Sequence, residues 1–277
     1  MQGFFYTMVI ASLLFAQEPR NSRSFLVKVE PVKSGTMREY IYAYGRVTGL
    51  EEAAVVPTMP GRVVSILKNE GERVKKDEII ALLDREIPGV KTEYLQIVSP
   101  INGIITYING KVGQIATQTQ PFAYIVSEQQ AVEVNLSSDD LQKVRVGANA
   151  FAIDGGKEIE GSVVSRSYGL DPMSLTGKVR ISLRRNVLQV GSIVNVKIVT
   201  KEKSGVLIVP ENAIAEKGDR TVVYVVKDEV AKEVPVEVGI ISEGWAEVKG
   251  NLNVKDLVVT LGAEGLYDGA PVELGGK

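Results

Sequence analysis

The chain has 277 residues, enough for about two domains, and it contains no cysteine and no histidine. These absences exclude a disulfide framework, a thiolate nucleophile, a Cys/His zinc site and an imidazole general base. The 32 Lys and Arg against 34 Asp and Glu give a formal net charge of −2, which offers no basic surface for nucleic acid. We therefore expect no catalytic residues, no metal site and no cofactor.

The N-terminal segment 4–16 (FFYTMVIASLLFA) is apolar but shorter than the roughly 20 residues that a membrane-spanning helix needs. Its length is typical of the hydrophobic region of a secretory signal, and polar Gln17-Glu18 follows it. No Lys or Arg precedes it, so an uncleaved anchor or a buried N-terminal segment is the alternative to a cleaved signal peptide. A signal or an anchor at residues 1–16 predicts export across the cytoplasmic membrane.

An internal repeat is the most informative feature of the chain. Residues 55–83 (VVPTMPGRVVSILKNEGERVKKDEIIALL) align without a gap with residues 97–125 (IVSPINGIITYINGKVGQIATQTQPFAYI), an offset of 42. Apolar residues recur at spacings typical of short buried strands, and each half is too small to bury its strands alone. The two halves must therefore share one core. Four glycines coincide in this alignment, and we expect them at tight turns or close strand crossings: Gly61, Gly71, Gly103 and Gly113.

The repeat carries the resemblance to a known domain. The first half reads P-G-x-V-x-x-I-x-x-x-x-G-x-x-V from Pro60 to Val74, and a second such pattern runs from Ser99-Pro100 to Gly113-Gln114. This pair resembles the biotinyl/lipoyl-type hammerhead domain. Three later stretches then resemble, in order, parts of the periplasmic adaptors, or membrane fusion proteins, of tripartite efflux pumps of the resistance-nodulation-division type: 131–150, 188–197, and 209–214 together with 258–272.

The resemblance implies a mainly β, elongated multi-domain adaptor. It would comprise a lipoyl-like barrel-sandwich hybrid, a β-barrel and a membrane-proximal β domain. We divide the chain into a signal peptide or anchor (1–16), a linker with the first membrane-proximal strand (17–35), a β-barrel strand (36–50), the lipoyl-like domain (51–127), the β-barrel domain (128–203) and the membrane-proximal domain (204–277). Locally, residues 137–144 have the Ser cap and first-turn acids of a short helix, and Lys227-Asp228-Glu229 predicts a hairpin turn.

The segment between the two halves is short. Most members of this family carry a long α-helical hairpin there, whereas here residues 84–96 (DREIPGVKTEYLQ) would span only about 20 Å even as a helix. The chain therefore resembles a variant that lacks the hairpin. The outermost loop becomes the candidate channel-facing tip, with Arg85, Glu86, Ile87, Val90 and Lys91 as its residues. Apolar Ile87 and Val90 are the better anchors, because exposed ion pairs contribute little. The alternative is an exposed turn that contacts nothing.

Two other candidate sites have simpler explanations. In biotin or lipoyl carriers, a lysine at the joint between the halves is acylated by the cofactor, within Met-Lys-Met or Asp-Lys-Ala. Here the frame is Val90-Lys91-Thr92, which favours a solvated lysine. Asp139 and Asp140 are adjacent in the expected helix and do not face each other, so we interpret them as helix-start charges rather than a metal pair.

The resemblance implies a function in assembly rather than catalysis. The protein would be a periplasmic adaptor, associated with the cytoplasmic membrane, that links a cytoplasmic-membrane efflux transporter to an outer-membrane channel. It would form a homo-oligomeric ring, and the exported substrates would be drugs or other small molecules. The alternatives are a biotinyl/lipoyl carrier modified at Lys91, the adaptor of an ATP-driven exporter, and a cell-envelope scaffold without transport.

Overall fold

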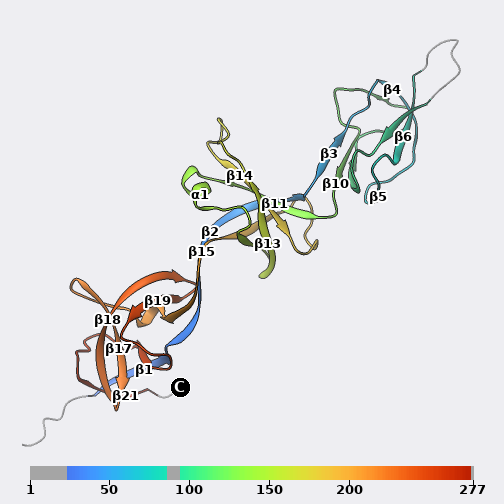
Figure 1. Cartoon of the computed structure of the whole chain (residues 1–277). Coiled ribbons are helices and arrows are strands. Elements are labelled where there is room, and N and C mark those ends of the chain that lie inside the picture. Colours follow the sequence, from blue (N-terminus) through green and yellow to red (C-terminus); the bar gives the residue numbers. More distant parts are fainter. Residues whose placement is uncertain (1–23, 86–93, 276–277) are drawn as a thin grey trace, which may run out of the picture. The chain divides into compact units, whose positions relative to one another are not determined.

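The computed structural model describes residues 24–85 and 94–275, which form 21 strands, one α-helix and one 3-10 turn (Figure 1). The mainly β, multi-domain fold expected from the sequence is confirmed. The chain divides into two compact units. One consists of Thr36–Ser204, and the other combines the chain up to Gly35 with the chain from Gly205 onward. The first unit contains a lipoyl-like domain and a β-barrel.

The lipoyl-like domain consists of two four-stranded sheets, with the strand orders β3-β10-β8-β5 and β7-β6-β4-β9. The first half of the repeat supplies β3 to β6, and the second half supplies β7 to β10. Each sheet therefore contains two strands from each half, and neither half can complete a sheet alone. The strands are β3 (Glu52–Val55), β4 (Gly61–Ile66), β5 (Arg73–Val74), β6 (Ile79–Asp84), β7 (Leu95–Val98), β8 (Gly103–Ile108), β9 (Ile115–Ala116) and β10 (Ala123–Val126).

The two halves repeat the same backbone. Strands β4 and β8 begin 42 residues apart, at Gly61 and Gly103, and so do β5 and β9, at Arg73 and Ile115. The pairing repeats as well, because β4 pairs with β6 and β9 as β8 pairs with β10 and β5. Both halves fill one core, in which each large apolar side chain contributes about 1.5–3 kcal/mol when fully buried. Its most buried members are Val63, Ile80, Ala81, Leu83, Ile105, Ala123 and Ile125, each 1% exposed or less.

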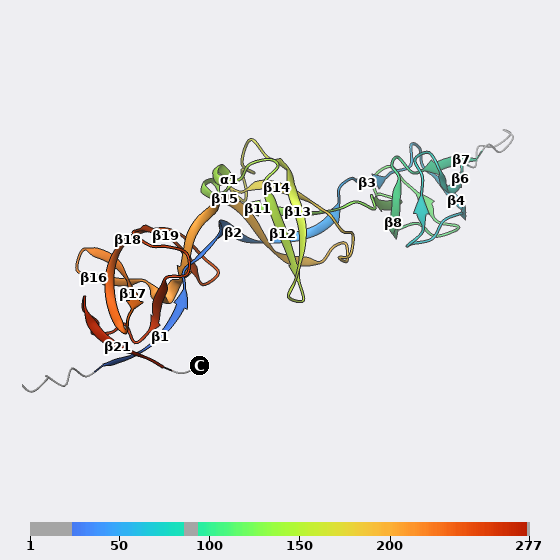
Figure 2. The same cartoon turned by 60° about the horizontal axis from the view of Figure 1, so that its bottom comes forward.

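The β-barrel of the first unit is closed (Figure 2). Its strand order is β12-β13-β14-β11-β2-β15, and β12 also pairs with β15. Since β2 precedes the lipoyl-like domain in the chain and β11 follows it, that domain is an insertion into the barrel. The barrel strands are β2 (Lys33–Gly49), β11 (Gln130–Leu136), β12 (Asn149–Asp154), β13 (Lys157–Arg166), β14 (Gly177–Leu183) and β15 (Ile193–Pro210).

One short helix, α1 (Ser138–Lys143), lies between β11 and β12, where the sequence predicts it. The Ser137 hydroxyl accepts a hydrogen bond from the Asp140 backbone N–H, and Asp139 and Asp140 occupy the first turn. The Ser137 hydroxyl provides a hydrogen-bond partner for one of the N–H groups that have none at a helix start. The negative charges of the two aspartates interact favourably with the positive end of the helix dipole. Leu141 is buried against Gly177, where an added Cβ would lie 2.2 Å from the Leu141 Cδ2 atom.

The second unit is built from both ends of the chain. Strand β1 (Phe25–Pro31) pairs with β20 and β21, and the end of β15 pairs with β19. A closed circuit β18-β21-β1-β20-β17 results, because β17 also pairs with β18. The remaining elements are η1 (Glu211–Ala213), β16 (Ala215–Lys217), β17 (Arg220–Lys227), β18 (Val230–Ser242), β19 (Trp245–Gly250), β20 (Leu257–Leu261) and β21 (Ala270–Leu274).

The predicted hairpin joins β17 to β18. Lys227 pairs with Val230, so the turn itself is only Asp228-Glu229. Both residues have positive φ, 51° and 59°, as a type I′ turn requires. Asp tolerates this conformation well, whereas Glu229 is held there by the flanking strands.

Glycine substitutions should separate two kinds of constraint in the lipoyl-like domain. At Gly103 an added Cβ would lie 2.2 Å from the Val126 carbonyl oxygen, whereas at Gly71 the φ of 83° is unfavourable but no atom lies within 4 Å. We predict that Gly103→Ala lowers the free energy of unfolding by about 3 kcal/mol. Gly71→Ala should lower it by only about 1 kcal/mol. Urea unfolding measures both, and equal losses would contradict the strand crossing at Gly103.

Candidate functional site

The candidate tip of the lipoyl-like domain lies mostly outside the described residues. Arg85 directly follows β6, and Tyr94 directly precedes β7. Glu86, Ile87, Val90 and Lys91 belong to residues 86–93, which are not described. The channel-facing tip and the modification of Lys91 therefore stay predictions.

The four glycines of the repeat fall into two pairs with different geometry. Gly71 and Gly113 have φ angles of 83° and 87°, in the left-handed region. Gly61 and Gly103 instead lie where strands approach closely, since a Cβ at Gly61 would lie 2.9 Å from the Asp84 carbonyl oxygen. Each pair thus occupies equivalent positions of the two halves.

The described residues contain no cluster that could hold a metal ion. No three acidic side chains within residues 24–85 and 94–275 are grouped in a way that could hold a metal ion. The charged side chains instead form surface pairs, such as Lys68 with Glu78 at 2.6 Å. This hydrogen bond raises the pKa of Lys68 and lowers the pKa of Glu78. Both shifts favour the charged forms, so the pair is structural rather than a proton donor or acceptor near neutral pH.

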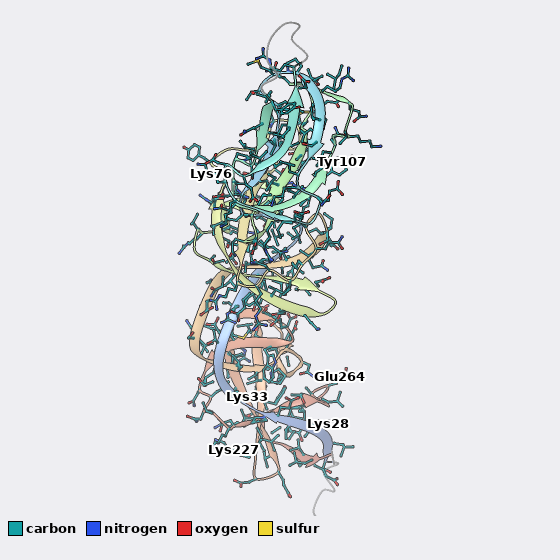
Figure 3. The ribbon with its side chains drawn as sticks, turned by 90° about the vertical axis from the view of Figure 1, so that its right-hand side faces the viewer. Lys28, Lys33, Lys76, Tyr107, Lys227 and Glu264 are labelled. Carbon is teal, nitrogen blue, oxygen red and sulfur yellow. The ribbon has the colours of Figure 1, made fainter. Side chains whose placement is uncertain are left out.

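The second unit has a shallow depression around the only tryptophan of the chain. The depression has a volume of 630 Å³, and three separate segments of the chain line it: Glu30, Pro210-Glu211-Asn212 and Gly244-Trp245. The Lys33 ammonium lies 4.3 Å from the centre of the Trp245 ring, a cation–π distance (Figure 3 labels Lys33). Trp245 is half-buried at this surface, and tryptophan is enriched among the residues that dominate protein interfaces.

The sequence alone does not predict this depression around Trp245. Lys33 and Trp245 are more than 200 residues apart, and only the pairing of both chain ends in one unit brings them together. Gly244 has a φ of 80° and closes the turn between β18 and β19, and its carbonyl accepts a hydrogen bond from the Glu211 N–H.

Comparisons with known proteins show what this arrangement resembles. Residues 206–274 match the family described as the YknX C-terminal permuted SH3-like domain. MacA from Actinobacillus actinomycetemcomitans is 17% identical with a TM-score of 0.62, covering 83% of this chain and 98% of that chain. ZneB from Cupriavidus metallidurans is 19% identical with a TM-score of 0.51, covering 91% of this chain and 96% of that chain.

The chain has the fold of the membrane fusion proteins, the periplasmic adaptors. A MacA–MexA chimera that contains the α-hairpin domain of Pseudomonas aeruginosa MexA is also similar, at 18% identity and a TM-score of 0.58, covering 83% of this chain and 99% of that chain. No curated protein matches the sequence. The resemblance to membrane fusion proteins derived from the sequence is thus confirmed at the level of the fold.

The adaptor fold here carries a short segment between the lipoyl-like halves. Strand β6 ends at Asp84 and β7 begins at Leu95, so ten residues connect them. Among the described residues, no helix combines the length and the hydropathy needed to cross a bilayer.

The contact between Lys33 and Trp245 can be tested directly. We predict that Lys33→Met lowers the free energy of unfolding by about 0.5–1 kcal/mol, the usual contribution of an exposed cation–π pair. It should also change the emission of Trp245, which is the only tryptophan reporter. Lys28→Met, at an exposed position of β1 in the same unit, is the control and should change neither quantity. Identical effects of the two substitutions would argue against the contact.

Proposed function

We propose that this protein is the non-enzymatic adaptor subunit of an efflux assembly. It would work in the periplasm, attached to the cytoplasmic membrane by its N-terminal segment, and connect a cytoplasmic-membrane transporter to an outer-membrane channel. The observation that carries this proposal is the adaptor fold, which extends over 83% of the chain in the comparison with MacA and 91% in that with ZneB. The lack of His and Cys supports a role without catalysis.

We assign contact with the transporter to the second unit, which contains the C-terminal part of the chain. It contains both the first described strand of the chain, β1, and the region that matches the permuted SH3-like family. An N-terminal anchor would thus hold this unit at the membrane, since only Ser24 separates β1 from the N-terminal 23 residues. Within this unit, the candidate contact is the depression lined by Trp245, Glu30 and Glu211, in which Trp245 would be the anchor residue.

The lipoyl-like domain is the part that we assign to the channel side and to the ring. Its rigidity comes from the shared core, in which Ile80, Leu83, Ile105 and Ile125 are fully buried. A rigid inserted domain can transmit a movement of one partner to another without catalysing a reaction. Copies of the domain would pack around the ring axis, and the short tip would approach the channel.

The tip is the sharpest test of this assignment. Replacing residues 86–92 by a short Gly/Ser turn should leave the thermal unfolding temperature and transporter binding unchanged, and should abolish the drug resistance that the intact protein restores to a deletion strain. The physical reason is that Ile87 and Val90 would lose their apolar contact with the channel.

Matched substitutions separate apolar from charged contacts at the tip. Ile87→Ser with Val90→Ser should reproduce the loss of resistance, whereas Arg85→Ser with Lys91→Ser should have little effect. Full resistance with the Gly/Ser turn would remove the tip from the mechanism. Failure of the intact protein to restore any export would instead overturn the adaptor function itself.

A further inference from the structure

The chain contains two Asn-Gly dipeptides, and the fold holds them in different ways. Both lie in the second half of the lipoyl-like repeat, and an isoleucine precedes each: Ile101-Asn102-Gly103 and Ile108-Asn109-Gly110. Asn-Gly is a chemically labile dipeptide, because glycine has no side chain to keep its backbone nitrogen away from the asparagine amide. Since the local sequences are nearly the same, a difference in reactivity between the two sites would report the structure.

The first dipeptide is held by a hydrogen bond and by a strand. The Asn102 side-chain oxygen accepts a hydrogen bond from the Lys76 N–H at 2.9 Å. Gly103 is buried at the start of β8, where it pairs with Val74 of β5, and an added Cβ there would overlap the Val126 carbonyl oxygen. The amide and the backbone that would have to approach each other are therefore both fixed in place.

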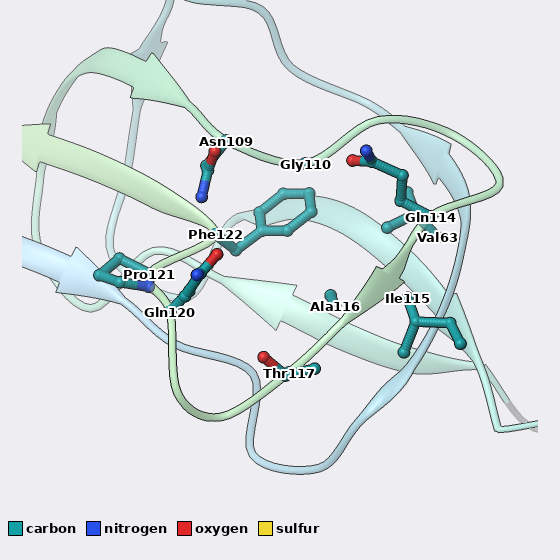
Figure 4. A pocket seen from close by; sticks show the side chains of 10 residues that line it. All are labelled: Val63, Asn109, Gly110, Gln114, Ile115, Ala116, Thr117, Gln120, Pro121 and Phe122. Atoms are coloured by element: carbon teal, nitrogen blue, oxygen red, sulfur yellow. The ribbon is translucent and has the colours of Figure 1, made fainter.

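The second dipeptide lacks these restraints. Asn109 is exposed and follows directly after β8, which ends at Ile108. Within the described part of the chain, neither the Asn109 side-chain amide nor the Gly110 N–H has a hydrogen-bond partner. The two residues line a surface depression of 270 Å³, so water reaches the amide (Figure 4).

Packing explains the glycine of the second dipeptide but not the asparagine. Figure 4 shows the backbone of Gly110 beside the Phe122 ring, and an added Cβ at Gly110 would overlap that ring. Phe122 is buried in the core of the domain, so a larger residue at position 110 would displace it. The equivalent of Asn109 in the first half is Leu67, so this backbone does not need an asparagine. The labile pair thus consists of a required glycine and a replaceable asparagine.

We infer that Asn109 is a site of spontaneous modification, at which asparagine is converted to aspartate and isoaspartate. The Gly110 nitrogen loses its proton to a solvent base and attacks Asn109 Cγ. The new N–Cγ bond closes a succinimide ring, the Cγ–Nδ2 bond breaks, and ammonia leaves with a proton taken from water. Water then adds to either ring carbonyl, and opening of the ring gives aspartate or isoaspartate. Overall, each conversion consumes a water molecule and releases an ammonia molecule.

The modification would change this turn in two ways. It adds a negative charge next to an existing one, because the Glu70 carboxylate accepts a hydrogen bond from the Ile108 N–H at 2.8 Å. Lys111 follows two residues after Asn109 and would offset part of this repulsion. Isoaspartate also lengthens the main chain by a methylene group between β8 and the glycine that packs against Phe122. Both changes weaken the packing at this edge of the lipoyl-like core.

The test compares the two asparagines within a single peptide of the full-length protein. The protein is incubated at physiological temperature in mildly alkaline buffer, digested with trypsin under mildly acidic conditions and analysed by tandem mass spectrometry. The tryptic peptide 92–111 contains both Asn102 and Asn109, and its fragment ions assign the exchange of NH2 for OH to one or the other. Native protein should react at Asn109 at least about tenfold faster than at Asn102, where hydrogen bonds must first open.

The same measurement in guanidinium chloride removes the contribution of the fold. Each native rate is divided by the rate of the same asparagine in the unfolded chain, so that intrinsic differences between the two sites cancel. Asn109 should keep most of its unfolded rate, and Asn102 should keep only a small part. Equal ratios at the two sites would overturn the inference. So would native protein that retains Asn109 over a time in which the unfolded chain converts it. Neither outcome depends on the transporter or on the channel.

Two matched variants connect the modification to stability. Asn109→Ser removes the site and should keep its thermal unfolding temperature during the incubation, whereas the natural protein should lose stability as isoaspartate accumulates. Asn102→Asp keeps an acceptor oxygen for the Lys76 N–H and should lose stability as the natural protein does. An equal loss in Asn109→Ser and in the natural protein would show that the loss arises elsewhere, and would overturn the structural consequence assigned to this site.

Discussion

The shared core of the lipoyl-like domain is the constraint on which the first unit depends. Neither half can bury Ile80, Leu83, Ile105 or Ile125 without the strands of the other, because each sheet has its two central strands from one half and its two edge strands from the other. Closing this core fixes the ends of β3 and β10. The chain that enters through β3 and leaves through β10 is then returned to the barrel at β11, where Leu50 N–H donates to the Gln129 carbonyl. The barrel strands β2 and β11, on either side of this inserted domain in the sequence, pair with each other.

The second unit also depends on contacts between residues that are distant in the sequence. Strand β1 fills the position between β20 and β21, so the start and the end of the described chain form one sheet. In an adaptor, this arrangement would keep an N-terminal membrane attachment beside the domain proposed to contact the transporter. The position of Trp245 in a depression lined by Glu30 and Glu211 follows from it.

Much of this fold could be predicted from the sequence, and the reasons are local. The repeated glycines and apolar residues specified two equivalent halves with a common core. Ser137 with Asp139 and Asp140 specified the helix, and Asp228-Glu229 between two apolar runs specified the hairpin. The contact of Lys33 with Trp245 could not be predicted, because it depends on strands from opposite ends of the chain. The tip residues Glu86, Ile87, Val90 and Lys91 remain predictions.

The proposed contact of the second unit with a membrane transporter can be tested directly. The most direct measurement is purification of the tagged protein from its own membranes after mild crosslinking, followed by identification of its partners by mass spectrometry. The account predicts a polytopic transporter that is recovered with the natural protein and reduced several-fold with Trp245→Ala, while Tyr168→Ala, at a fully exposed position of the barrel unit, changes nothing. Recovery of no transporter, or of equal amounts with both variants, would contradict it.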